Sequence, residues 1–545
     1  MKAWIKFYPS WVKPNLEYPK IPLSEIFRNS VNKHPNHIAL IYYDARITYK
    51  QLDEYVNKCA RALNELGLHK GDRVALCLPN IPQYIIAFFG ILRAGGIAVP
   101  CNPFYKEREL EYQINDAGAK IIVTLCDKIQ GFDACDVIMR IKNKTKLESI
   151  ITTSMADFLT DEYKKRLRVE RIHYDNTYDL MNLIKDQINQ PLLTQIEFDE
   201  VALLQYTGGT TGIPKGAMLT HYNLVSNAVA MSEWLKLKND ICLGVLPFFH
   251  IYGLTVSMNA SLYSASTLIL IPRFDAKIVM EIIERERVTV FCGVPTMYIA
   301  LINHPDILKY NLSSLRVCVS GGAPLPSSLI ESFKRFSSAQ LIEGYGLTEA
   351  SPVTHCNPLG FNKPSSIGIP IPDTEAKIVD LNDPLKELKV GEIGELAVRG
   401  PQVMKGYWNK ISETELVLKN GWLLTGDIAK MDEDGYFYII DRKKDMINVS
   451  GLKVWPREVE DVLYEHPAVK EVAVIGVADP YKGESVKAYV VLKDGYQGKV
   501  TENELIAFCR ERIANYKVPK LIEFKEQLPK TSVGKVLRRA LRELN

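Results

Sequence analysis

Segments with the pattern of a buried strand alternate with segments of helical periodicity over much of this chain. The stretch "RVALCL" (residues 73–78) has the apolar run of a buried strand. It follows a helix-like segment and a glycine stop, and the apolar residues of that segment recur at helical spacing: Leu52, Val56, Ala60 and Leu63. Strand–helix alternation of this kind implies parallel sheets with helices on their faces.

The alternation returns further along the chain. Strands are predicted at residues 266–272, 288–295 and 315–325, and helices at 276–287 and 296–304. The helix at 276–287 is predicted to bury one apolar face made by Ile278, Val279, Ile282 and Ile283. The sequence therefore predicts an α/β fold with a large N-terminal domain of parallel α/β sheets.

The pattern changes after Glu375. Short, turn-separated strands at 376–381, 394–400 and 435–441 indicate a small β barrel or antiparallel unit. The charged segment "RKKDMINVSGLKV" then leads into a compact α/β part, with helices near 456–466 and 502–513 and strands at 469–477 and 486–492. We predict an N-terminal domain of residues 1–441 and a small C-terminal domain of residues 442–545, with the boundary at 441–445. A chain of 545 residues is long enough for two or more domains.

Charge and cysteine usage exclude several classes of protein. A net charge of +3 gives no electrostatic basis for binding nucleic acid or an anionic membrane. The ten cysteines are scattered, with no CxxC pair. This favours reduced cytosolic thiols, most of them buried, over disulfides or a zinc site. We therefore expect a cytoplasmic protein.

The most membrane-like run covers residues 84–100. Arg93 and the pair Gly95 and Gly96 interrupt it before it could span a bilayer, so a buried helix followed by a strand is predicted there. The first residues contain no apolar signal core. Peripheral membrane contact stays open, and so does the oligomeric state, monomer or homodimer.

A loop rich in glycine and threonine, "YTGGTTGIPKG", lies between a predicted strand at 201–206 and a predicted helix at 221–235. Glycine lets successive backbone N–H groups turn toward one point, where they form a nest for an anion. Hydroxyls of the threonines add donors and Lys215 adds positive charge, so a polyphosphate is the expected ligand. Taken alone, the loop also fits a flexible surface loop.

Two other phosphate-binding patterns do not fit this loop. The P-loop pattern needs glycine before the lysine and Ser or Thr after it, whereas Pro214 precedes Lys215 and Gly216 follows it. The dinucleotide pattern GxGxxG is also absent from the loop. Further motifs are needed to identify the ligand.

Five motifs in order resemble those of the adenylate-forming enzymes, which include acyl-CoA synthetases, firefly-luciferase-type enzymes and peptide-synthetase adenylation domains. The motifs are "YTGGTTGIPKG", "EGYGLTE" (343–349), "GWLLTGD" (421–427), "DRKKDMINVSGLKVWPREVE" (441–460) and "PKTSVGKVLRR" (529–539). The resemblance covers nearly the whole chain. Within the family, "VPTMYIALINHP" and "KPSSIGIPIPDTEAKIVD" look most like fatty acyl-CoA ligases.

The resemblance implies a two-step reaction with ATP, coenzyme A and Mg²⁺. A carboxylate attacks the α-phosphorus of ATP, which gives an acyl adenylate and pyrophosphate. The thiol of coenzyme A then attacks the acyl carbon, and AMP leaves. The protein must mainly position anions and neutralise charge in the transition state.

The resemblance also assigns catalytic roles. Lys535 matches the C-terminal catalytic lysine, which bridges the carboxylate and the α-phosphate. Thr348 and Glu349 would serve the α-phosphate and Mg²⁺, with Thr207 as a second oxygen ligand of the metal. His250 matches a histidine beside the acyl pocket, although a buried structural histidine is the alternative for it.

Further residues are assigned to the nucleotide and to coenzyme A by the same resemblance. The phosphate loop would comprise Thr207, Gly208, Gly209, Thr210, Thr211, Gly212 and Lys215. The adenine site would comprise Gly322, Ala323, Glu343, Gly344 and Tyr345, with Tyr345 stacked on the base. Among the nucleotide residues, Asp427 and Arg442 would bind the ribose, and Lys444 would be the hinge. Ser450 and Gly451 would line the coenzyme A tunnel.

Alternatives to a fatty acid:CoA ligase stay open. Medium- or long-chain fatty acids are the predicted substrates, and short, hydroxylated or aryl acids are the alternatives. An enzyme that loads a carrier protein, or one that oxidises its adenylate, would share the first step, but this chain contains no carrier domain. A non-catalytic nucleotide binder would have no need of Lys535.

Overall fold

The computed structural model describes residues 2–128, 133–207, 213–450, 452–481, 483–530 and 536–544. The chain divides into two compact units. The first contains Ala3–Glu375 and Arg399–Gly421, and the second contains Ala376–Val398 and Trp422–Asn545. The predicted domain boundary at 441–445 lies inside the second unit. It stays a prediction about where the C-terminal domain begins.

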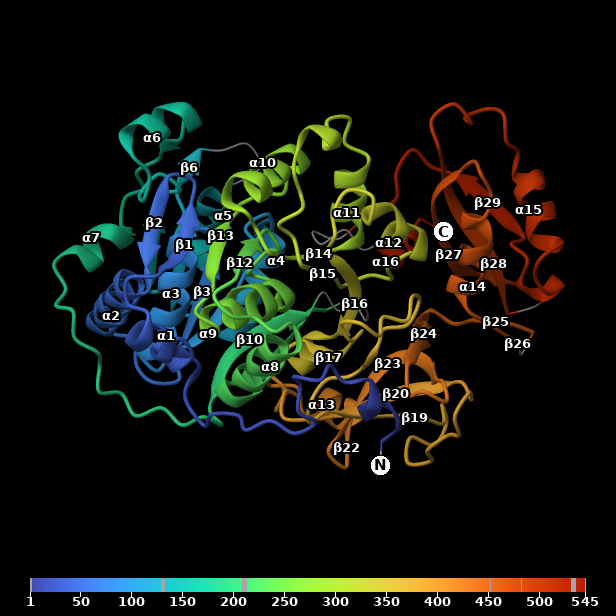
Figure 1. The fold of residues 1–545 in the computed structure, drawn as a ribbon, viewed down its shortest axis with the longest axis horizontal. Coiled ribbons are helices and arrows are strands. Elements are labelled where there is room, and N and C mark those ends of the chain that lie inside the picture. Colours follow the sequence, from blue (N-terminus) through green and yellow to red (C-terminus); the bar gives the residue numbers. More distant parts are fainter. Residues whose placement is uncertain are drawn as a thin grey trace. The chain divides into compact units, whose positions relative to one another are not determined.

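Two large, mainly parallel sheets form the frame of the first unit, with helices around their strands (Figure 1). The nine-stranded sheet has the order β18 (Ile369–Pro370), β17 (Val353–Cys356), β16 (Gln340–Gly346), β15 (Val317–Ser320), β14 (Val290–Gly293), β12 (Ile241–Gly244), β13 (Thr267–Leu270), β1 (Ile38–Tyr42) and β2 (Ala45–Thr48). Its central strands pair in parallel, as the strand–helix alternation predicts.

The eight-stranded sheet combines parallel central strands with an antiparallel edge. Its order is β21 (Gly406–Tyr407), β11 (Lys215–Thr220), β10 (Val201–Thr207), β4 (Ile97–Pro100), β3 (Arg73–Cys77), β5 (Ile121–Leu125), β7 (Ser149–Thr153) and β9 (Tyr178–Asp179). Strand β10 pairs in parallel with β4 and antiparallel with β11. The antiparallel edge holds both strands that flank the glycine loop.

Helix α2 (Tyr49–Glu65) shows how local sequence sets these elements. Thr48 caps the helix, because its hydroxyl accepts the N–H of Gln51 while the Gln51 side chain accepts the N–H of Thr48. The predicted apolar face of the helix is confirmed, and its members are all buried: Leu52, Val56, Ala60 and Leu63.

In helix α10 (Ala276–Glu286) the predicted apolar face is partly wrong. Val279, Met280 and Ile283 are buried, whereas Ile278 is 43% exposed. The buried stripe is centred between Val279 and Met280, so Ile278 lies on its flank and reaches solvent.

The membrane-like run forms helix α3 (Pro82–Arg93), which is buried throughout and leads to β4, as predicted. Arg93 at its end is also buried, and its Nη1 lies 2.9 Å from Asp53 Oδ1. In the described part of the chain, no helix has both the length and the apolar character needed to cross a bilayer. All ten cysteines are free and buried.

The second unit holds two further sheets. One contains the antiparallel strands β20 (Gly394–Arg399), β23 (Trp422–Met431) and β24 (Phe437–Arg442), with β19 (Glu375–Val379) beside β20. The predicted antiparallel unit is therefore present. The other has the order β26 (Leu452–Val454), β25 (Ile447–Val449), β28 (Gly483–Leu492) and β27 (Val469–Asp479), with β29 (Leu521–Phe524) beside β28.

Helices α14 (Pro456–Tyr464) and α15 (Glu502–Arg510) pack on this last sheet. Val459, Leu463 and Leu505 from the helices share one apolar core with Val474 and Val490 from the strands. The small C-terminal α/β part predicted from the sequence is thus present, and the predicted fold class is confirmed.

Candidate active site

The glycine loop joins two strands that are paired with each other. Strands β10 and β11 run antiparallel, and Thr207 at the end of β10 lies opposite Lys215 at the start of β11. This pairing brings both ends of the loop together. Five predicted phosphate-binding residues lie outside the described residues, and their roles stay predictions: Gly208, Gly209, Thr210, Thr211 and Gly212.

Both ends of the loop are hydrogen-bonded to helix α4 (Glu107–Ala117). The Tyr206 hydroxyl donates to Asp116 Oδ2 at 2.6 Å, and the Tyr112 hydroxyl donates to the carbonyl of Pro214 at 2.9 Å. Burial and the Asp116 carboxylate raise the pKa of Tyr206, so its hydroxyl stays a donor. A Cβ on Gly216 would lie 3.2 Å from the Tyr206 ring, which favours glycine at that position.

Lys215, Tyr407 and Glu349 come together although they are far apart in the sequence. Strand β21 pairs with β11, which places Tyr407 opposite Ala217. The Lys215 Nζ lies 4.4 Å from the centre of the Tyr407 ring, a cation–π contact. The Tyr407 hydroxyl donates to Glu349 Oε1 at 2.7 Å. Tyr407 therefore contacts both Lys215 and the predicted metal ligand Glu349.

Strand β16 carries the predicted adenine-site residues Glu343, Gly344 and Tyr345 at its carboxyl end. Parallel pairing places Glu343 opposite Ser320 of β15, and the loop after β15 contains Gly322 and Ala323. The N–H of Leu325, in that loop, donates to Glu343 Oε2 at 3.2 Å. The predicted adenine-site residues are thus brought together at the carboxyl edge of the sheet, where ligands of α/β proteins bind.

The ring of Tyr345 is held by a neighbouring histidine. Strands β16 and β17 place Tyr345 opposite His355, and the two rings meet edge to face at a centroid distance of 5.9 Å. Burial lowers the pKa of His355 to about 3, so its imidazole is neutral at physiological pH. Thr348 and Glu349 follow in a short 3₁₀ turn, Thr348–Ala350.

His250 directly precedes an unusual helical segment. The N–H of Tyr252 donates to His250 Nδ1 at 3.2 Å, and a π-helical stretch, Gly253–Asn259, follows. Such stretches are rare and occur mostly at functional sites. The histidine therefore has a structural hydrogen bond, while its predicted place beside the acyl pocket stays a prediction.

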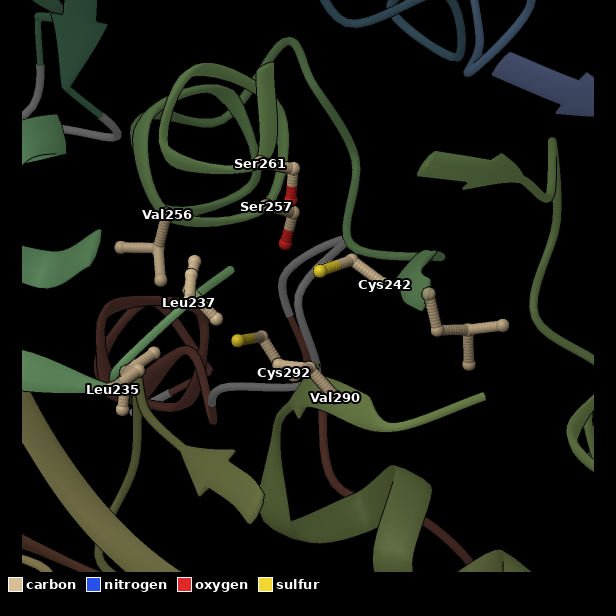
Figure 2. A pocket seen from close by; sticks show the side chains of 9 residues that line it. Leu235, Leu237, Cys242, Val256, Ser257, Ser261, Val290 and Cys292 are labelled. Atoms are coloured by element: carbon tan, nitrogen blue, oxygen red, sulfur yellow. The ribbon is translucent and has the colours of Figure 1, made fainter. Parts of the chain in front are cut away.

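One face of this π-helical stretch borders a cavity of about 10 Å³. Ser257 and Ser261 project from one helix toward Cys242 and Cys292 on the opposite wall (Figure 2). A space of that size holds about one water molecule. An acyl chain could enter there only after the surrounding side chains had moved.

In the second unit, Asp427 and Arg442 form the predicted ribose pair. Strands β23 and β24 place them opposite each other, and Arg442 Nε lies 2.8 Å from Asp427 Oδ1. Asp427 is buried, so the ion pair fixes its carboxylate in place. Lys444 lies in the short 3₁₀ turn Lys443–Asp445 that follows. Burial of its ammonium lowers the pKa of Lys444 to about 8.

Ser450, one of the two predicted coenzyme A residues, lies between the paired strands β25 and β26 of the second unit. Ser450 follows β25 with a φ of 52°, and Gly451 lies outside the described residues. Lys535 also lies outside them, so its catalytic role stays a prediction. The chain on either side of Lys535 is paired: Lys530 bridges to Val536, and the N–H of Leu537 donates to the carbonyl of Pro529 at 2.8 Å.

Comparison with known proteins gives the family. Residues 27–408 match the family described as AMP-binding enzyme, and residues 458–535 match the AMP-binding enzyme C-terminal domain. The chain belongs to the AMP-binding enzyme family. It is 44% identical to a Bacillus subtilis protein named long-chain-fatty-acid–CoA ligase, over 99% of this chain and 98% of that protein. It is 40% identical to an Escherichia coli O157:H7 protein of the same name, over 99% and 98%.

Solved structures of the family share the fold. ATP-bound MatB from Rhodopseudomonas palustris superposes with a TM-score of 0.86 at 30% identity, over 96% of this chain and 99% of that one. The anthranilate CoA ligase AuaEII in complex with anthranoyl-AMP gives 0.85 at 29% identity, over 97% and 98%. A fatty acyl CoA synthetase of Mycobacterium tuberculosis gives 0.74 at 30% identity, over 96% and 98%.

The sequence analysis assigned no role to three residues of this site: Tyr206, Asp116 and Tyr407. Tyr407 contacts Glu349 across 58 residues of chain, and Tyr206 contacts Asp116 across 90. No spacing rule connects residues so far apart. The only local signal was the glycine at 216, which makes room for the Tyr206 ring.

Proposed function

We propose that this AMP-binding enzyme is an acid–thiol ligase that converts a medium- or long-chain fatty acid to its coenzyme A thioester. ATP is cleaved to AMP and pyrophosphate in the reaction. The observation that carries this proposal is the whole-length similarity to a Bacillus subtilis protein named long-chain-fatty-acid–CoA ligase, at 44% identity. The site geometry is consistent with the nucleotide part of the proposal, because strand pairing brings the predicted nucleotide residues of each unit together.

In the first step a carboxylate oxygen of the fatty acid attacks the α-phosphorus, and the bond to pyrophosphate breaks. The loop between β10 and β11 would hold the β- and γ-phosphates, with Lys215 neutralising charge. Tyr345 would stack on adenine, and Asp427 would accept hydrogen bonds from the ribose hydroxyls. Lys535 would stabilise the charge that develops at the α-phosphate.

The donor set at Glu349 fits a magnesium ion. Mg²⁺ prefers one or two carboxylates together with phosphate oxygens and water, so a single well-placed glutamate is sufficient. Tyr407 fixes one oxygen of that carboxylate, and the Thr207 hydroxyl would be the second protein ligand. When bound, Mg²⁺ supplies positive charge to the phosphates of ATP.

In the second step the sulfur of coenzyme A attacks the acyl carbon, and AMP leaves as the carbon–oxygen bond breaks. Ser450 and Gly451 would border the path of the thiol. Lys535, Ser450 and Gly451 all belong to the proposed C-terminal domain, 442–545. We propose that this domain takes a different orientation in each step and turns at Lys444.

The ten buried, unpaired thiols fit a reducing compartment, so we place the reaction in the cytoplasm. None of these cysteines has a role in the proposed chemistry. The attacking thiol comes from the co-substrate.

A panel of acids tests the proposal directly. Saturated acids of graded length, with short, hydroxylated and aryl acids beside them, are incubated with ATP, Mg²⁺ and coenzyme A. We expect the highest kcat/KM for thioester formation with medium or long chains, and pyrophosphate release that requires the acid. A maximum for short or aryl acids would reject the fatty acid assignment. Adenylate formation without any thioester would reject coenzyme A as the acceptor.

A further inference from the structure

Five charged side chains of the second unit form one buried network. The acidic members are Asp441, Asp445 and Glu460, and the basic members are Arg538 and Arg542. Burial is greatest for the acidic side chains: Asp441 is 2% exposed, Asp445 8% and Glu460 11%. Charges removed from water to this extent are stable only when they are paired.

Arg538 is the centre of the network. Its Nη2 lies 2.7 Å from both oxygens of Glu460, and its Nε donates to Glu460 Oε1 at 3.2 Å. The Arg538 Nη1 faces the other two carboxylates, at 3.4 Å from Asp445 Oδ2 and 3.6 Å from Asp441 Oδ1. A planar guanidinium can serve three carboxylates in this way, whereas an ammonium cannot.

The two aspartates are held from the other side as well. Asp441 accepts the backbone N–H groups of Arg442 and Arg457, each at 2.7 Å. Asp445 Oδ1 lies 2.8 Å from Arg542 Nη2. Burial acts to raise the pKa of Asp445, but Arg542 and Arg538 outweigh it and hold that pKa below its usual value. Asp445 is therefore an ionised partner of both arginines.

The positions of these residues in the chain give the network a role. Asp441 and Asp445 lie on either side of Lys444, the proposed hinge. Arg538 comes three residues after Lys535 and two residues after Val536, which pairs with Lys530. The network thus joins the residues around the hinge to the chain that follows Lys535.

We propose that Arg538 is a positioning residue that ties the chain following Lys535 to Asp445 and Glu460, which lie beyond the hinge. Asp445, Glu460 and Arg538 all follow Lys444 and turn together with the domain, whereas Asp441 precedes the hinge. This inference rests on the proposed function, because it concerns how the lysine reaches the α-phosphate. A purely structural ion network would instead support both steps equally.

The test uses Arg538→Lys in the full-length protein, with Arg539→Lys as the matched control. Arg539 is the next residue, is 56% exposed and pairs with Glu543 at the surface. Both half-reactions are measured: adenylation by pyrophosphate release, and thioester formation from a synthetic acyl adenylate. We expect Arg538→Lys to slow adenylation by roughly 10–10²-fold and thioester formation by less than about threefold. The control should change neither.

A second readout does not depend on activity. Amide hydrogen exchange of the segment Leu537–Arg542 should quicken in Arg538→Lys, while exchange in helix α15 stays unchanged. Unchanged exchange at Leu537–Arg542 would overturn the proposal, and so would an equal loss of both half-reactions. An enzyme that activates no acid would instead reject the proposed function, and exchange would still decide the role of Arg538.

Should Arg538→Lys fail to fold, Glu460→Gln provides the same test. Glutamine keeps the shape of the side chain and can still accept from Arg538, but the pair loses its charge. We expect the same division between the half-reactions, with a smaller loss of adenylation. An equal loss in both half-reactions would again identify a structural role and overturn the proposal.

Discussion

The two units hold their proposed site residues by different interactions. In the first unit, the ends of the glycine loop are fixed by strand pairing and by tyrosine hydroxyls that donate to Asp116, to a carbonyl and to Glu349. In the second unit, ion pairs such as Asp427 with Arg442 and Glu460 with Arg538 fix the charged side chains, and the proposed hinge residue Lys444 lies in a short 3₁₀ turn.

This difference separates what each unit contributes. Strand-paired residues on large sheets have little freedom, which suits a site that binds the same nucleotide throughout the reaction. Residues in turns can change their backbone conformation, which suits a segment that acts in one step at a time. Substitutions in the first unit should therefore weaken nucleotide or metal binding, and substitutions in the second should divide the two half-reactions.

The largest effect is expected for Lys535→Ala. Adenylation should slow by roughly 10²–10³-fold or more, because one charge that stabilises the transition state is lost. Thioester formation from a supplied acyl adenylate should be largely retained. Lys530→Ala is the control. Lys530 lies five residues before Lys535 and forms an ion pair with Glu471 at 2.7 Å. Equal loss in both half-reactions would contradict a role confined to the first step.

Lys444→Pro should divide the half-reactions in the opposite direction. Proline fixes φ near −65° and restricts Lys443 as well, so the turn at the hinge is hindered. If the domain is held in the adenylating orientation, thioester formation should fall by roughly 10²-fold while adenylation is better retained. Lys444→Ala separates loss of the side chain from loss of backbone freedom. Wild-type rates in both half-reactions would show that Lys444 is not the hinge.

Glu349→Gln tests the proposed magnesium site of the first unit. The substitution keeps the size of the side chain and its acceptor for Tyr407 but removes the charge that would hold Mg²⁺. The Mg²⁺ concentration for half-maximal adenylation should rise by at least about tenfold, and kcat should fall. Glu331→Gln, at a surface pair with Lys334, is the control. An unchanged Mg²⁺ titration would remove Glu349 from the metal site.

The smallest effect is expected for Tyr206→Phe, which removes only the hydroxyl that donates to Asp116. The KM for ATP should rise by about fivefold, as expected for the loss of one hydrogen bond to a charged group, with little change in kcat. Tyr174→Phe is the matched control. The Tyr174 hydroxyl also donates to an aspartate, Asp136, at 2.7 Å, but neither residue flanks the glycine loop. A fall in kcat at constant KM would mean that Tyr206 does not position the loop.

Much of the fold could be predicted because strands and helices have local periodicity. The buried face of α2 and the buried run of α3 follow from residue spacing alone. Strand β11 was not predicted, because its six residues follow the glycine loop directly and begin with a lysine and a glycine. Ile278 was misplaced, because spacing gives the direction of a buried stripe only to within about one residue.

The site was predictable only where a motif is continuous in sequence. Asp427 and Arg442 come from two such motifs, and strand pairing brings them together. The contacts of Tyr407 and Arg538 depend on tertiary structure, since their partners lie 58 and 78 residues away. Contacts between residues so far apart in the sequence follow from the tertiary structure and not from any local pattern.

The burial of all ten thiols has a practical consequence for studying this enzyme. Burial raises the pKa of Cys59 and Cys101 to about 12, so neither thiol ionises near neutral pH. A colorimetric thiol reagent added to the native protein should therefore report free coenzyme A with almost no background. The same reagent becomes a probe of unfolding once denaturant is added, because each cysteine then gives a signal. One chromophore can thus follow substrate consumption in buffer and loss of the folded state in urea.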